Sequence, residues 1–369
     1  METVLTGIRI LDLTRYFPGP FATLRLQEQG AEIIKVEDKN GDPARYMDSY
    51  MGEEGCIFRS MSRGKKCVSL NMKDAEDLAQ FKELVSGVDA LIESFRPGVT
   101  KRLGIDFESL IKINPRLVYV SLSGYGQNTS LANLAGHDLN YLAYSGVLDQ
   151  LLDEGNKPIK PQIAFADLIA GLAASEAVSM GLLKSFRSGE GVYVDLAMTD
   201  AVLSFMGLHV TYHSATGMEH GINEHGIGYG IFRTSDNRYV ALCALEEKFF
   251  TNFCKAVGKE HLIEYQHSPL DDSNPAFREI KETIAEKPIE YWTEFALRVD
   301  CCMAPVLKTS ELKNSVYVRE RGFIESRWGL DYVATHFAGE GKGFLNYEKA
   351  FSKLGEDNHL FLNKKINNI

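Results

Sequence analysis

The stretch IRILDLTRYFPGPFATLRLQEQGAEIIKV, residues 8–36, decides the fold of this chain. Residues 8–13 form a short apolar run typical of a buried strand, and a proline–glycine–proline break follows it. Pro20 suits the first residue of a helix, where its missing N–H costs nothing, and Gly30 suits the helix stop. Residues 32–36 then predict a second strand. A strand, a helix and a strand in this order predict a parallel sheet with a right-handed crossover.

The alternation of strand and helix continues beyond this unit. Short apolar runs predict further strands at 67–72, 89–95, 117–123 and 192–198. An amphipathic segment and a long segment rich in Ala and Leu predict helices at 74–85 and 163–185. The first two hundred residues therefore predict one large parallel sheet with helices packed on it.

The sequence changes character after residue 200. Residues 213–230 are rich in glycine and indicate a linker, and residues 232–245 resemble a β-hairpin. Helical segments and a strand at 301–307 follow. We predict an α/β fold with two domains. The large parallel-sheet domain spans 1–200 and the smaller α/β domain spans 228–315, with linkers at 201–227 and 316–329. The polar segment at 330–369 is expected to pack back onto the large domain.

Composition excludes several classes of protein. The net charge of −10 argues against a nucleic-acid binder, which would need a basic face. The six cysteines include no C-x-x-C pair, which argues against a zinc site and fits a reduced, cytoplasmic protein without a bound metal. The N-terminus lacks a basic region before an apolar run, and no stretch reaches ~18 uninterrupted apolar residues. We therefore expect neither a signal peptide nor a membrane span.

The common nucleotide and hydrolase motifs are absent. The turn after the first strand reads R-Y-F-P-G-P and lacks the G-x-G-x-x-G fingerprint of a dinucleotide site. No G-x-x-x-x-G-K-[ST] loop for phosphates and no G-x-S-x-G elbow for a nucleophilic serine occurs. The chemistry of this chain must therefore lie elsewhere.

One carboxylate stands out among apolar residues. Asp167, in FADLIAGLAA (165–174), lies where the helix should be buried, and burial raises the pKa of a carboxylate unless partners hold it ionised. The plain alternative is a cap near the helix start. His137, in GHDLNYLAYSGVL (136–148), precedes an amphipathic run. The plain alternative there is that Asp138 caps a helix and His137 is a loop residue.

Two basic segments are candidate anion sites. Arg63 and Lys65 precede a predicted strand, whereas Arg96 follows one directly and Arg102 lies a few residues further on. Ligands of open α/β sheets bind at the carboxyl ends of strands, so Arg96 is well placed to meet a phosphate. The alternative is a set of solvated surface charges.

These segments together resemble the family III CoA-transferases, a family that also contains the α-methylacyl-CoA racemases. The resemblance covers nearly the whole chain and rests on six segments in order: LTGIRILDLTRYFPGP (5–20), GAEIIKVE (30–37) with GDPAR (41–45), SRGKKCVSLNMK (62–73), ESFRPGVTKRLGID (93–106), GHDLNY (136–141) and SGEGVYVDLAMTDA (188–201).

The resemblance implies an architecture and a substrate. It implies a large domain with a Rossmann-like sheet, a small domain, and two subunits interlocked as a homodimer. It also implies an acyl-CoA thioester as substrate, with coenzyme A held as part of that substrate and no tightly bound cofactor. The residues carried over as CoA contacts are Arg63, Lys65, Arg96, Val99 and Arg102.

The family implies two chemistries around one aspartate, which Asp167 matches. In the racemases that aspartate and a histidine, matched by His137, remove and return the α-proton of a 2-methylacyl-CoA. In the transferases the aspartate becomes covalently attached and passes CoA to a carboxylic acid acceptor. Glu246, in ALEEKFF (244–250), matches a third racemase position. The run Asp167-Leu168-Ile169-Ala170-Gly171 is closer in sequence to the transferases, so both chemistries stay open, with the racemase favoured. A CoA-binding protein without catalysis is a third alternative, against which the joint presence of Asp167, His137 and Glu246 argues.

Overall fold

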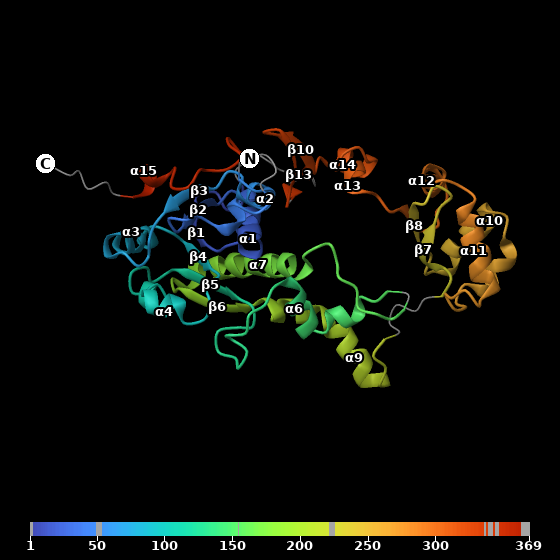
Figure 1. Cartoon of the computed structure of the whole chain (residues 1–369), viewed down its shortest axis with the longest axis horizontal. Coiled ribbons are helices and arrows are strands. Elements are labelled where there is room, and N and C mark those ends of the chain that lie inside the picture. The colour runs from blue at the N-terminus through green and yellow to red at the C-terminus, as the bar shows by residue number, and fades with distance from the viewer. Residues whose placement is uncertain are drawn as a thin grey trace. The chain divides into compact units, whose positions relative to one another are not determined.

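The computed structural model describes residues 3–48, 54–153, 155–220, 226–335, 337–338, 342–343 and 347–362 (Figure 1). The chain forms two compact units. Unit 1 comprises Met1–Thr211 together with Val316–Ile369, and unit 2 comprises Tyr212–Ser315.

A six-stranded parallel sheet forms the centre of unit 1. Its order is β3-β2-β1-β4-β5-β6, and the strands are β1 (Arg9–Leu13), β2 (Glu32–Glu37), β3 (Lys66–Ser69), β4 (Ala90–Glu93), β5 (Val118–Ser123) and β6 (Val192–Ala197). The strand order reverses between β1 and β4, as in doubly wound Rossmann-like sheets. The predicted fold class, an α/β protein with a Rossmann-like parallel sheet, is confirmed.

Strands β1 to β5 are buried on both faces of the sheet, as is usual for parallel strands, whereas the edge strand β6 exposes alternate side chains. Alternate residues of a strand point to opposite faces, and β1 shows the consequence. Ile10 packs with α1 (Pro18–Glu28) and α7 (Phe165–Ser188), whereas Leu11 and Leu13 pack with α3 (Ala75–Ser86) on the other face. A one-residue slip in register would turn every one of these side chains to the wrong layer.

Helices α1 and α7 lie side by side against one face of the sheet (Figure 1). α1 begins at Pro18 rather than at the predicted Pro20, because either proline is tolerated in a first turn. Gly171 of α7 allows the close approach, since an added Cβ would lie 2.7 Å from the Pro18 carbonyl oxygen and 2.7 Å from the Phe21 ring. The packing of these helices thus depends on a small residue at the contact.

By length and composition α7 is also apolar enough to cross a bilayer, although composition alone is weak evidence for that. Within unit 1 its inner face packs against β5, β6 and α1. Its outer face keeps large apolar side chains in contact with solvent, among them Leu172, Met180, Leu183 and Phe186.

The remaining helices of unit 1 surround the sheet. They are η1 (Pro43–Arg45), α2 (Cys56–Ser62), α4 (Val99–Leu103), α5 (Phe107–Leu110), α6 (Asp138–Tyr144), η2 (Val147–Gln150), α8 (Met198–Leu203), η3 (Ser204–Met206), α14 (Val316–Arg321) and α15 (Asn358–Phe361). Helix α9 (Gly207–Thr216) crosses from unit 1 into unit 2. The predicted linker at 201–227 therefore contains helical turns, because its sequence up to Thr216 has no helix breaker after Gly207; residues 221–225 of that prediction lie outside the described residues.

The predicted second linker at 316–329 is likewise structured. It holds α14 and the strand β10 (Ile324–Arg327), which pairs antiparallel with β11 (Leu330–Val333). These elements belong to unit 1. The short strands β12 (Phe337–Ala338) and β13 (Lys342–Gly343) form a second ribbon.

The C-terminal segment covers the free edge of β3. The outward N–H groups of Cys67 and Ser69 donate to the side chains of Asp357, at 2.7 Å, and Asn358, at 2.9 Å. Arg45 donates to the carbonyl oxygen of Ser352 at 3.1 Å. An edge strand whose donors are occupied in this way cannot pair with another chain.

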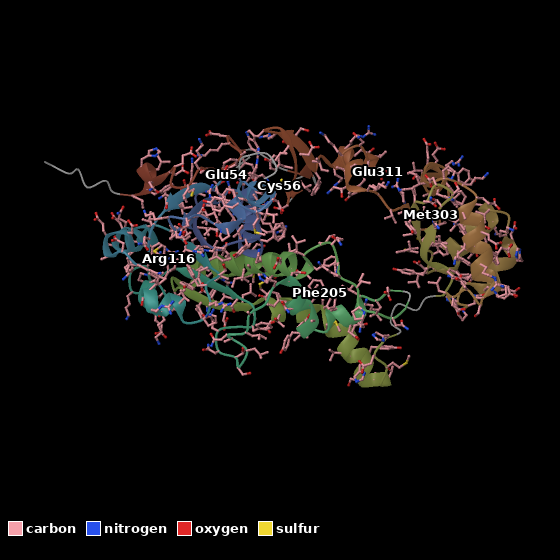
Figure 2. The ribbon with its side chains drawn as sticks, viewed as in Figure 1. Glu54, Cys56, Arg116, Phe205, Met303 and Glu311 are labelled. Atoms are coloured by element: carbon pink, nitrogen blue, oxygen red, sulfur yellow. The ribbon has the colours of Figure 1, made fainter. Side chains whose placement is uncertain are left out.

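Unit 2 is a smaller α/β unit. Its antiparallel sheet has the order β7-β8-β9, from β7 (Tyr229–Arg233), β8 (Tyr239–Cys243) and β9 (Met303–Pro305). The helices are α10 (Glu247–Ala256), η4 (Glu260–Tyr265), α11 (Pro275–Ala285), α12 (Ile289–Arg298) and α13 (Thr309–Leu312), around a core rich in aromatic side chains. Arg238 donates to both carboxylate oxygens of Glu311 at 2.7 Å, which holds α13 to the hairpin. Figure 2 labels Glu311.

Candidate functional site

The carboxyl ends of β1 and β4 form the topological switch point of the sheet, where open α/β folds bind their ligands. The loops after these two strands are joined, because the Arg15 amide donates to the Ser94 hydroxyl at 3.2 Å. Tyr16, in the loop after β1, has a left-handed backbone with φ of 64°. Strain of this kind in a non-glycine residue gathers at functional sites. This edge of the sheet is therefore the first place to look for a site.

Arg96 lies in the loop that leaves β4 at this edge and is exposed. A tight turn follows, in which the Val99 amide donates to the Arg96 carbonyl oxygen at 3.1 Å. Gly98 has φ of 82°, a backbone that favours glycine. Arg102 is exposed on α4, and Val99 is half-buried at its start. The structure thus brings Arg96, Val99 and Arg102 together in one segment with both guanidinium groups accessible.

Asp167 lies in the first turn of α7. Because α7 precedes the parallel strand β6 and packs on it, the helix runs antiparallel to the strands, and its N-terminus points toward their carboxyl ends. Asp167 is not the N-cap, which is Ala164. Its backbone amide donates to Oδ1 of Asp138 at 3.1 Å. The carboxyl group of Asp167 is therefore free for another task than capping its own helix.

The electrostatics around Asp167 favour the protonated acid. Burial, and the Asp138 carboxylate nearby, raise the pKa of Asp167 to about 7. A helix N-terminus by itself would stabilise the ionised form, so burial and the second carboxylate outweigh the helix here. A carboxyl group with its pKa near neutral can both accept and donate a proton under ordinary conditions.

His137 is the N-cap residue of α6, with its side chain exposed. Its backbone amide donates to Oδ1 of Asn140 at 3.0 Å. The alternative in which Asp138 caps this helix does not hold, because His137 is the N-cap and the Asp138 side chain accepts the Asp167 amide of α7 instead. Asp138 therefore joins the starts of α6 and α7 and brings His137 into the neighbourhood of Asp167. The described contacts include no hydrogen bond between the two side chains.

Three tyrosines extend the site between Asp167 and Arg96. The ring of Tyr125 meets those of Tyr141 and Tyr144 edge-on at 5.4 Å. The Tyr141 hydroxyl donates to the Gly136 carbonyl oxygen at 2.7 Å. Burial and the nearby Tyr125 and Asp167 raise the pKa of Tyr141 to about 12, whereas Arg96 lowers it. Tyr141 thus feels the charges of both Asp167 and Arg96, which makes these residues parts of one site.

Arg63 and Lys65 do not face this site as predicted, because both cations are buried. Arg63 donates to Glu28 at 2.8 Å and to the Val333 carbonyl oxygen at 2.7 Å. Lys65 is surrounded by acceptors, with Thr23 Oγ1 at 2.7 Å, the Pro20 carbonyl oxygen at 2.8 Å and Asp12 at 3.2 Å. These contacts make them internal counter-ions, and their predicted role as CoA contacts does not fit their burial.

Glu246 belongs to unit 2, where it is the exposed residue that precedes α10. His137 and Asp167 both belong to unit 1. Among the described residues, no group of three or more His, Cys, Asp or Glu side chains is placed to hold a metal ion.

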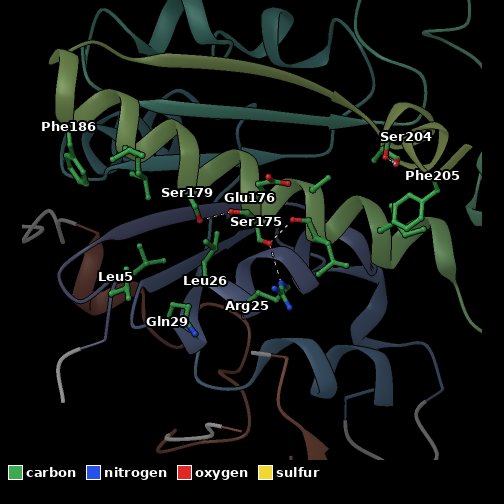
Figure 3. A pocket seen from close by; sticks show the side chains of 17 residues that line it. Leu5, Arg25, Leu26, Gln29, Ser175, Glu176, Ser179, Phe186, Ser204 and Phe205 are labelled. Atoms are coloured by element: carbon green, nitrogen blue, oxygen red, sulfur yellow. Dashed lines mark hydrogen bonds between the residues drawn. The ribbon is translucent and has the colours of Figure 1, made fainter. Parts of the chain in front are cut away.

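A separate groove of about 770 Å³ runs along the outer face of α7 (Figure 3). Leu172, Leu183 and Phe186 of α7 line it together with Leu26 of α1 and Phe205 of η3. Ser175 accepts a hydrogen bond from Arg25 at 3.3 Å within it. Asp167 is not part of this lining, so the groove is a feature distinct from the candidate site.

Two site residues were missed from the sequence. Asp138 entered the sequence analysis only as an alternative helix cap, and its contact with Asp167 joins positions 29 apart in the chain. Tyr125 lies in a Gly-Tyr-Gly segment that lacks the third glycine of the dinucleotide fingerprint and carries no other motif. The signal that could have found both is the shared edge of the sheet, since β5 leads into this region at its carboxyl end.

Comparison with known proteins relates the chain to CoA-transferases and to an acyl-CoA racemase. Residues 5–334 match CoA-transferase family III. The chain is 30% identical to an acetyl-CoA:oxalate CoA-transferase of Acetobacter aceti over 88% of this chain and 86% of the relative. It is 34% identical to the human alpha-methylacyl-CoA racemase over 87% and 83%. It is 32% identical to the human succinyl-CoA:glutarate CoA-transferase over 70% of this chain and 60% of that protein.

The fold has close counterparts among solved structures. A CAIB/BAIF family protein from Brucella suis superposes with a TM-score of 0.87 over 98% of both chains, at 23% identity. At that identity the likeness shows the fold.

We predict that Arg63→Met lowers the free energy of unfolding by about 3–5 kcal/mol, because it leaves the Glu28 carboxylate buried without its cation. Arg9→Met is the matched control, since it breaks an exposed ion pair with Glu32 and should cost less than about 1 kcal/mol. Denaturant unfolding of both variants measures the difference. Equal losses in the two variants would contradict a structural role for Arg63.

Proposed function

Because the chain belongs to CoA-transferase family III, we propose that it racemises a 2-methylacyl-CoA thioester by removing and returning the α-proton. In this proposal Asp167 and His137 are the two acid–base groups, one for each face of the reacting carbon. Glu246 is a third catalytic group, carried over by resemblance to the racemases. The observation that carries the proposal is the pKa of Asp167, raised to about 7.

A raised pKa suits proton transfer for a physical reason. The α-proton beside a thioester is weakly acidic, so a useful base must be both largely ionised and strong enough at neutral pH. A carboxylate at the ordinary pKa of about 4 is too weak a base, whereas one near 7 meets both demands. Histidine is the other side chain commonly used for proton transfer at neutral pH. An aspartate and a histidine on opposite faces of the carbon can therefore remove and return the proton in either direction, as racemisation requires.

The binding of the CoA part is assigned to the segment after β4. Arg96 and Arg102 are exposed guanidinium groups at the carboxyl edge of the sheet, and guanidinium groups suit phosphate oxygens in geometry and charge. In this proposal Val99 packs against the apolar part of the CoA chain. The coenzyme enters and leaves as part of the thioester, and no tightly bound cofactor takes part in the proton transfer.

The second candidate is CoA transfer to a carboxylic acid acceptor. Asp167 would attack the acyl-CoA to form a mixed anhydride and release the CoA thiolate. The thiolate would then attack the aspartyl carbonyl, giving an aspartyl-CoA thioester and releasing the donor acid as its carboxylate. The acceptor carboxylate would next attack this thioester to form a second mixed anhydride, and the released thiolate would attack its acceptor carbonyl, giving the new acyl-CoA and free Asp167. The observation that favours it is the run after Asp167, which reads Leu168-Ile169-Ala170. Relatives named as CoA-transferases are also about as similar to this chain as the racemases are.

The racemase proposal predicts that the enzyme exchanges the α-hydrogen of a 2-methylacyl-CoA with solvent deuterium without any acceptor acid. Mass spectrometry of the recovered thioester measures the exchange. The rate of proton removal by Asp167 should rise with pH through about 7, since only the ionised carboxylate accepts a proton. Asp167→Asn and His137→Ala should each lower the rate by about 10²–10⁴-fold.

The same preparation separates the two candidates. Hydroxylamine added during turnover with a donor thioester and an acceptor acid cleaves an aspartyl thioester and leaves a hydroxamate on Asp167. Movement of CoA to the acid, with the hydroxamate on Asp167 and no deuterium exchange, would show that transfer is the correct reaction. Full activity of Asp167→Asn in both the deuterium-exchange assay and the CoA-transfer assay would rule out the racemase proposal and the transferase alternative.

We also propose that the working form is a homodimer, as the family resemblance implies. The outer face of α7 and the adjoining η3 leave Leu172, Met180, Leu183, Phe186 and Phe205 exposed. Large apolar side chains that are exposed together on one face are typical of a protein–protein surface. A second copy of the chain is the occupant we assign to it.

Sedimentation velocity tests the dimer. The wild-type chain should sediment as a dimer at micromolar concentration, and Leu183→Glu together with Phe186→Glu should shift it to the monomer. Leu297→Glu, at an exposed apolar position of α12 outside this face, is the control and should leave the dimer intact. A monomeric wild-type protein would refute the assignment.

A further inference from the structure

Glu93 differs from every other buried carboxylate among the described residues. It is the last residue of β4 and is only 1% exposed. The others have a basic partner, in the pairs Asp12–Lys65, Glu28–Arg63, Glu37–Arg45, Asp42–Lys35 and Asp357–Lys349. Within the part of the chain that the structure describes, no cation contacts Glu93. A buried acid without a counter-ion is costly, so its presence calls for a reason other than charge pairing.

The contacts of Glu93 are to neutral donors at the carboxyl edge of the sheet. Oε2 accepts the backbone N–H of Phe95 at 2.7 Å. Oε1 accepts the hydroxyl of Ser121, which lies directly opposite on β5. Burial, and the Asp195 carboxylate nearby, raise the pKa of Glu93 to about 7. Both oxygens are therefore used, and neither contact neutralises an ionised carboxylate.

These contacts join two loops that leave neighbouring strands. Phe95 immediately precedes Arg96, so the bond to its amide fixes the first turn of the loop that carries this arginine. Ser121 also accepts Nε2 of Gln127 at 2.7 Å. The amide of Gln127 in turn donates to the Asp195 carboxylate at 2.9 Å and 3.1 Å. Glu93 thus connects the loop after β4, through the Phe95 amide, to the loop after β5, through Ser121 and Gln127.

We propose that Glu93 is a positioning residue, which acts through the Phe95 amide to hold Arg96 in the orientation that binds the phosphates of CoA. The assignment rests on the proposed function, since it presupposes that Arg96 meets CoA. Glu93 itself is too deeply buried to touch the ligand. It acts by limiting the conformations of the loop, which lowers the entropy lost when the arginine is ordered on binding.

The test is a double-mutant cycle measured by calorimetric titration of the full-length protein with free CoA. Glu93→Met removes the acceptor at similar volume, and we expect it to weaken CoA binding about tenfold, the effect of about one hydrogen bond. Glu93→Gln keeps an acceptor for the Phe95 amide and should stay within about twofold of wild type. In the background of Arg96→Ala, Glu93→Met should have no further effect, because residues that act as one unit are not additive.

A purely structural role would give a different pattern. It would lower the melting temperature of Glu93→Met and weaken binding equally with and without Arg96, and that additivity would overturn the assignment. If Glu93→Met does not fold, Ser121→Ala, which removes the second anchor of the same carboxyl group, is measured in the same cycle against the same criterion. If the wild-type protein binds CoA and Glu93→Met binds it with the same affinity, this inference alone is overturned. A wild-type chain that does not bind CoA would overturn the proposed function and this inference together.

Discussion

The pairing of β1 with β2 on one side and β4 on the other is the constraint on which the rest of the structure depends. It places the reversal of strand order in the middle of the sheet and opens the loops after β1 and β4 toward each other. Arg15 and Ser94 close that meeting point with a hydrogen bond. The antiparallel course of α7 then brings Asp167 to the same edge as Arg96. The proximity of a candidate reactive group and a candidate phosphate-binding segment is a consequence of topology.

The electrostatic design of unit 1 divides its buried charges into two kinds. Arg63 and Lys65 are enclosed with carboxylates and serve the fold, since each partner would be costly to bury alone. Asp167 and Glu93 have no ion pair with any of the described side chains, and burial raises the pKa of both to about 7. Carboxyl groups of this second kind cost stability and are typical of functional sites. In our account Asp167 moves the proton, and Glu93 holds the loop that carries the arginine.

Much of the fold could be predicted from local patterns in the sequence. The strand at 8–13, the helix stop at Gly30 and the β-hairpin at 232–245 were predicted because a few neighbouring residues determine each of these conformations. The burial of Arg63 and Lys65 could not be predicted, because charged residues in a row look like surface and their partners Glu28 and Asp12 are distant in sequence. The helix α9 was not predicted, because the glycine-rich composition of residues 213–230 led to the prediction of a linker over 201–227. Asp167 was recognised as a buried acid whose pKa burial raises, whereas the further contribution of Asp138 depends on an orientation that follows from tertiary structure.

The protonation state of Asp167 is the central claim of this account, and infrared difference spectroscopy measures it directly. The carbonyl stretch of a protonated carboxyl group, taken as the difference between wild type and Asp167→Asn, is followed as a function of pH. We predict that the signal of the protonated acid disappears with a midpoint near 7, because burial and the neighbouring Asp138 oppose ionisation. A midpoint near 4, the ordinary value for an aspartate in water, would contradict the account.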